Sequence, residues 1–82
     1  MKATITQKLV ASYQKQAKAG EIPKPIEIND TDLTGFILRV QPSGRLAYIV
    51  QLGRGKRITL GDAAVLTPTQ GRDKARVAVS GL

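Results

Sequence analysis

Apolar residues in the first quarter of the chain recur with a helical period. They stand four positions apart and would form one stripe on a helix: Ile5, Leu9, Tyr13 and Ala17. Thr4 and Gln7 have the spacing of a capping box, which satisfies two otherwise unpaired backbone N–H groups at a helix start. Gly20 and the following Pro23 then predict the end of this helix near residue 20.

The middle of the chain alternates between apolar and polar residues, which is typical of β-strands. Three segments carry this signal: 36–40, 46–52 and 56–60. The turns between them, at 42–44 and 53–55, are short and rich in glycine, so we expect an antiparallel meander over residues 35–61. Residues 25–28 form a shorter alternating run, which we interpret as an edge strand within a linker that spans residues 20–34.

The last segment returns to a helical pattern. Thr67 and Gln70 form a second capping box, with Pro68 at the favoured first helical position. The apolar residues of this segment share one side: Ala75, Ala78, Val79 and Leu82. We therefore predict a helix over residues 67–82, and because its pattern is still running at the last residue we expect a parent chain that continues beyond it.

These patterns predict a single α+β domain over residues 1–82. Its expected architecture is a three-stranded antiparallel sheet, with a short edge strand, packed against an N-terminal and a C-terminal helix. Side chains alternate across a strand, so one sheet face should be apolar and hold the core. That face collects Phe36, Leu38, Val40, Leu46, Tyr48, Val50, Leu52, Ile58 and Leu60. The opposite face collects Ile37, Arg39, Gln41, Ala47, Ile49, Gln51, Arg57 and Thr59.

The charge distribution suggests a role for this second face. The net charge is +7, and residues 35–82 carry eight of the 13 basic residues against only Asp62 and Asp73. No acidic residue occurs between Gly35 and Gly61, so the second face is expected to be purely cationic. A surface of one sign attracts a polyanion. A merely solubilising surface is the alternative explanation of the same charges.

The sequence offers no constellation for catalysis. It contains no cysteine and no histidine, which removes the commonest metal ligands and the commonest general base. The Gly-rich segment at 53–56 lacks the spacing of a phosphate-binding P-loop. No apolar run is long enough to cross a membrane, and no signal peptide is recognisable. We therefore expect no enzyme activity, no metal, no cofactor, no small-molecule ligand and no membrane contact.

The residue types on the second face suit duplex DNA. Arginine can bind guanine and glutamine can bind adenine through paired hydrogen bonds, and a β-ribbon or sheet can enter the major groove. The expected base contacts come from Arg39, Gln51, Arg57 and Thr59. The expected phosphate contacts come from residues in or near the turns: Arg45, Arg54 and Lys56. Ile37 and Ile49 are expected to be exposed, where they would contact thymine methyl groups or sugars.

Three segments resemble the N-terminal arm-type DNA-binding domain of phage and prophage integrases, which are tyrosine recombinases. Residues 32–44, DLTGFILRVQPSG, are similar to the GLxLRVxPSG strand and turn of that family. RITLG at 57–61 resembles its RxxLG strand, and LTPTQ at 66–70, followed by KAR at 74–76, resembles its LSLxEAR motif. Order and spacing agree over residues 26–82, although Tyr48 stands where the family usually has tryptophan.

The resemblance implies a function in DNA integration and site-specific recombination. A three-stranded sheet would bind the attachment-site arms of duplex DNA with its exposed face, in a cytoplasmic protein encoded by a bacterium or a phage. The core-binding and catalytic domains of the parent recombinase would lie outside these residues, so the fragment itself would be non-catalytic, and other integrase protomers would be possible partners. Two alternatives remain open: a protein-interaction module anchored by Ile37 and Ile49, and a basic RNA-binding module, which would need exposed aromatic side chains.

Overall fold

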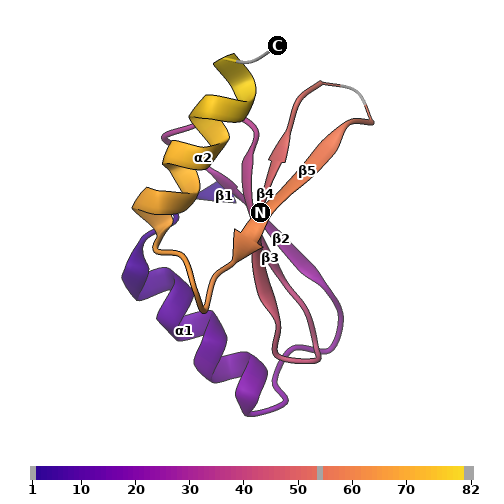
Figure 1. Ribbon diagram of the computed structural model, residues 1–82. Helices are drawn as coiled ribbons and strands as arrows, with labels where there is room; N and C mark the ends of the chain where they lie inside the picture. The colour runs from indigo at the N-terminus through magenta and orange to yellow at the C-terminus, as the bar shows by residue number, and fades with distance from the viewer. Residues whose placement is uncertain (1, 54, 81–82) are drawn as a thin grey trace.

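The protein folds into a five-stranded mixed sheet with two helices on one of its faces (Figure 1). The computed structural model describes residues 2–53 and 55–80. The strands lie in the sheet in chain order: β1 (Lys2–Ala3), β2 (Ile26–Asp30), β3 (Phe36–Val40), β4 (Leu46–Gln51) and β5 (Arg57–Asp62). The helices are α1 (Gln7–Lys18) and α2 (Pro68–Ser80).

The chain is α+β as predicted, but the predicted three-stranded antiparallel sheet is wrong. β2 is no edge strand in a linker, because it pairs with β3 from Ile26↔Val40 to Asn29↔Ile37, and its last two residues, Asn29 and Asp30, pair with β1 on its other side. β1 runs parallel to β2, and the other neighbouring strands are antiparallel. A parallel pair needs a crossover connection, and α1 supplies it, so β1, α1 and β2 form a βαβ unit.

Helix α1 begins at a different cap from the one that the sequence predicted. Thr6 is the N-cap, and its side-chain oxygen accepts a hydrogen bond from the Leu9 backbone N–H at 3.1 Å. Thr4 instead pairs with the Thr31 hydroxyl, because it directly follows β1 and lies beside the end of β2. The end of the helix is as predicted, since Gly20 has a φ of +73°.

Helix α2 begins at Pro68 with the predicted capping box. The Thr67 side chain accepts from the Gln70 N–H at 3.2 Å, and the Gln70 side chain accepts from the Thr67 N–H at 2.9 Å. Gly71, which lowers helix propensity, lies directly over two core rings. A Cβ atom there would stand 3.0 Å from an atom of Phe36 and 3.0 Å from one of Tyr48, so glycine allows α2 to approach the sheet closely.

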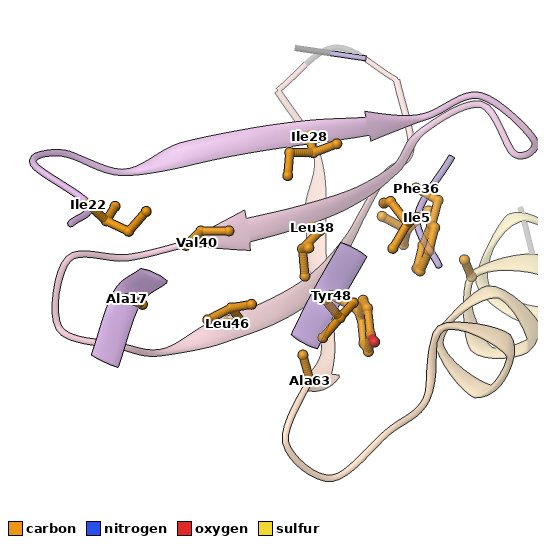
Figure 2. Close-up of a cluster of buried hydrophobic side chains, with 13 residues drawn as sticks. Ile5, Ala17, Ile22, Ile28, Phe36, Leu38, Val40, Leu46, Tyr48 and Ala63 are labelled. Atoms are coloured by element: carbon orange, nitrogen blue, oxygen red, sulfur yellow. The ribbon is translucent and has the colours of Figure 1, made fainter. Parts of the chain in front are cut away.

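The core lies between the helices and the predicted apolar face of the sheet (Figure 2). The face positions of β3 and β4 are at most 2% exposed: Phe36, Leu38, Val40, Leu46, Tyr48 and Val50. The third strand departs from the prediction, because Ile58 is 39% exposed and Leu60 is only half-buried. A register shift explains part of this difference: Tyr48 pairs with Gly61 while Ile49 pairs with Thr59, which leaves Leu60 as the extra residue of a β-bulge.

A buried ion pair joins the sheet to both helical segments. The carboxylate of Asp30, at the end of β2, accepts the Nε–H of Arg72 from α2 at 2.9 Å. It also accepts the backbone N–H of Ile5 at 2.9 Å and that of Leu33 at 3.1 Å. The Arg72 guanidinium further donates to the Ile5 carbonyl, so this cluster fixes the junction of β1 and α1 against α2.

Candidate nucleic-acid interface

The sheet face opposite the helices, here called the open face, carries the predicted base-contacting residues. The pairing register places Arg39 beside Ala47, Gln51 beside Arg57, and Thr59 beside Ile49. Because paired residues point to the same side of a sheet, Arg39, Gln51, Arg57 and Thr59 all belong to the open face. The structure therefore has these four side chains on one face of the sheet, as the alternation along the strands predicts.

The two isoleucines of this face are buried, so the prediction that they are exposed is wrong. Ile37 is 2% exposed and Ile49 is 5% exposed, although neither faces the helices. They pair with each other at the centre of the sheet, on β3 and β4. The sheet twists strongly (Figure 1), so that side chains from the flanking strands β2 and β5 meet above its middle.

The contact between the flanking strands is an ion pair of Arg57 with Glu27. The guanidinium of Arg57, on β5, donates from Nη1 to Glu27 Oε2 at 2.6 Å and from Nη2 to Glu27 Oε1 at 3.1 Å. Glu27 lies on β2, so the bridge passes over β3 and β4, and the register places Ile37 and Ile49 between its two ends. The hydrogen bonds from Arg57 are the main reason that the pKa of Glu27 lies below its usual value.

The open face is thus not purely cationic, which corrects the expectation drawn from the charge distribution. Glu27 pairs across the strands with Arg39, and Asp62 pairs with Ala47, so both carboxylates point to this face. Asp62 lies 4.0 Å from the guanidinium of Arg45. The charge pattern did not reveal these two carboxylates, because Glu27 lies on β2 before the acid-free stretch and Asp62 lies at the end of β5 just after it. The alternation of Ile26 and Ile28 around Glu27 could have indicated that Glu27 points to the open face.

Arg39 has no counter-ion in contact with it. It lies on the central strand β3 and is half-buried, and no hydrogen bond or ion pair joins its guanidinium to any residue in the described part of the chain. Its Nε atom is buried without a hydrogen-bond partner among those residues. Arg57 has the largest effect in lowering the Glu27 pKa, and Arg39 is near enough to lower it further, while burial acts in the opposite direction. The buried Nε is out of reach of a ligand, so an incoming acceptor would be bound by the two Nη atoms of Arg39, which are not buried.

The remaining predicted contact residues surround this centre. Arg45 and Lys56 are exposed at the turns that precede β4 and β5, while Arg54 lies outside the described residues. The Gln51 side chain donates to the Gly53 carbonyl at 3.3 Å, so it points along the β4–β5 hairpin. Gln41, which was placed on the same face but not predicted as a contact, follows β3 and is half-buried.

Neither a metal site nor a membrane-spanning helix is found in the described part of the chain. Residues 2–53 and 55–80 contain no group of three or more acidic residues that could hold a metal ion. Neither of the two helices described is long and apolar enough to cross a membrane. The chain matches no protein-family model, no curated protein and no solved structure. Its function therefore has to be inferred from the open face itself.

Proposed function

We propose that this chain is a non-catalytic DNA-binding domain that contacts duplex DNA through the open face. The resemblance to integrase arm domains suggests the biological setting, in which the domain recognises arm-type sites during DNA integration by a larger tyrosine recombinase. The isolated domain would then supply affinity and sequence preference, while the chemistry belongs to other parts of the parent protein.

The unpaired guanidinium of Arg39 is the observation that carries this proposal. It stands on the middle strand of the sheet, on the face that the helices leave uncovered, and has no partner among the described residues. Arginine forms paired hydrogen bonds with guanine and with phosphate. Cationic side chains at the turns, Arg45 and Lys56, lie outside this centre, as phosphate contacts around a base contact would require.

The structure gives less support to the two alternatives. A protein-interaction surface anchored by Ile37 and Ile49 would need these side chains to be accessible, and both are buried. A reader of single-stranded RNA stacks bases on exposed aromatic rings. The three aromatic residues of the chain are either fully buried, as Phe36 and Tyr48 are, or half-buried in contact with the core, as Tyr13 is.

The test replaces Arg39 by glutamine and measures binding to labelled duplexes by fluorescence anisotropy over a range of salt. We expect Arg39→Gln to weaken binding about tenfold and to relax the sequence preference, because a paired hydrogen bond to a base edge is lost, while the log–log salt slope should change little. Lys74→Gln is the matched control, since it removes one positive charge from the exposed surface of α2. Equal affinities for Arg39→Gln and Lys74→Gln would refute the assignment of the open face, provided that melting curves show both variants folded.

A further inference from the structure

The Glu27–Arg57 bridge places a carboxylate in the middle of a surface that should bind a polyanion. The two side chains remain accessible, at 34% for Glu27 and 43% for Arg57, so the bridge forms part of the open surface. A carboxylate repels phosphates that lie within about one Debye length, roughly 10 Å at 0.1 M salt. Its presence therefore lowers the affinity for any DNA backbone that approaches the open face.

The bridge nevertheless leaves Arg57 able to bind a base. A guanidinium has five N–H donors, and Glu27 takes one from each of the two Nη atoms. Three donors are thus left while the side chain is held in one orientation across the sheet. These three donors can contact a base edge placed against the open face with the bridge intact, whereas a contact that uses the two bridging N–H groups would require Arg57 to leave Glu27.

We propose that Glu27 is a selectivity-determining residue of this surface. It weakens binding to duplexes of arbitrary sequence more than binding to the preferred site, because it holds Arg57 over the open face and opposes contacts that are purely electrostatic. Non-specific binding depends almost entirely on such electrostatic contacts, whereas a preferred site adds hydrogen bonds to base edges. Penalising the unwanted partner is an effective way to gain specificity. The inference rests on the proposed function.

The experiment compares two neutralised carboxylates on two DNA duplexes. Repeated selection from a random pool with the unmodified domain supplies the preferred duplex, and a shuffled duplex of the same composition is the competitor. Glu27→Gln is the test variant, and Glu21→Gln is its control, because Glu21 is exposed in the segment after α1, outside the strands. Each variant raises the net charge by one from the same value of +7.

We expect Glu27→Gln to bind the shuffled duplex about tenfold more tightly, since one additional counter-ion released near 0.1 M salt changes affinity by about that factor. Binding to the preferred duplex should improve by no more than about threefold, so the preference falls. Glu21→Gln should increase the affinity for both duplexes equally and by less than about twofold. Arg57→Lys provides a second test: it keeps the charge but cannot bind a carboxylate through two N–H groups in a fixed fork, so it should also lower the preference.

Three results would overturn one or both proposals, and they can be told apart. Equal behaviour of Glu27→Gln and Glu21→Gln would show that Glu27 has no special role. An equal increase in affinity for both duplexes in Glu27→Gln would show that Glu27 weakens all DNA binding alike, which would refute its role in selectivity. A folded, unmodified domain that binds no duplex even at low salt would instead refute the proposed function, and the inference with it.

Discussion

Removing Arg72 should cost the domain a large part of its stability, because it would leave a buried carboxylate without its counter-ion. Asp30 is 3% exposed, and Arg72→Met would keep the length of the side-chain stem, with its packing over Phe36, while removing both charged hydrogen bonds to Asp30. Breaking a buried ion pair in this way costs about 3 to 5 kcal/mol. Proteins have roughly 0.05 to 0.15 kcal/mol of stability per residue, which gives about 4 to 12 kcal/mol here.

Urea and thermal unfolding followed by circular dichroism would measure this loss. A destabilisation of about 3 kcal/mol should lower Tm by at least about 12 °C in a domain of this size. The matched control is Arg76→Met, which breaks the exposed Arg76–Asp73 pair of the same helix and should cost less than about 1 kcal/mol. A loss below about 1 kcal/mol for Arg72→Met, or an equal loss for both variants, would refute the structural role of the buried pair.

The pH dependence of this loss provides an independent check. Burial opposes the ionisation of Asp30, but the hydrogen bonds from Arg72 and from the Ile5 N–H outweigh it and hold the pKa below the ordinary value of 3.8. Because the pKa of Asp30 is lower in the folded state, its ion pair stabilises the fold fully above pH 3.8. This stabilisation is lost as the pH falls through the folded-state pKa. The gap between Arg72→Met and the unmodified protein should therefore be widest at neutral pH and narrow in acid.

Two further substitutions test the packing of α2 on the core. Tyr48→Phe should raise stability by about 1 kcal/mol, because the buried Tyr48 hydroxyl has no hydrogen-bond partner in the described residues, and a lower urea midpoint would contradict this. Because burial raises the pKa of Tyr48 to about 12, the unfolded chain loses this proton at a lower pH than the folded domain does. The stability of the unmodified domain should therefore fall between pH 10 and 12, where absorbance follows the ionisation, and this fall should be smaller in Tyr48→Phe. Gly71→Ala should cost about 1 kcal/mol, since crowding of Phe36 and Tyr48 outweighs the gain in helix propensity; higher stability in the same assay would count against the close approach of α2.

Local patterns were sufficient to predict the elements whose signal lies within a few residues. The Thr67–Gln70 capping box fixed the start of α2, and alternation in β3 and β4 identified six buried core positions. β1 could not be found in this way, because a two-residue strand has no measurable period. β2 was recognised as a strand but not as an inner one, since 22 residues, including α1, separate it along the chain from its neighbour β1.

The chemistry of the open face was predicted less well than its location. The sequence showed which side chains share a face, because that depends only on alternation along each strand. It did not show that the sheet twists enough for Arg57 to reach Glu27, which lies 30 residues away in the chain. The burial of Ile37 and Ile49 follows from the same long-range geometry, so the prediction of exposed apolar anchors could not have been corrected from the local pattern.

The long separation between Asp30 and its partners also determines when the domain can fold during synthesis. Arg72 follows Asp30 by 42 residues and Ile5 by 67, so a nascent chain has completed β2 through β5 before the guanidinium emerges from the ribosome. Until then the meander would have to bury the Asp30 carboxylate without its counter-ion, and its core would lack Ala75, which α2 supplies. We therefore expect the emerging strands to stay open to chaperones and proteases until α2 is released, and the whole domain to form in one cooperative step after that point.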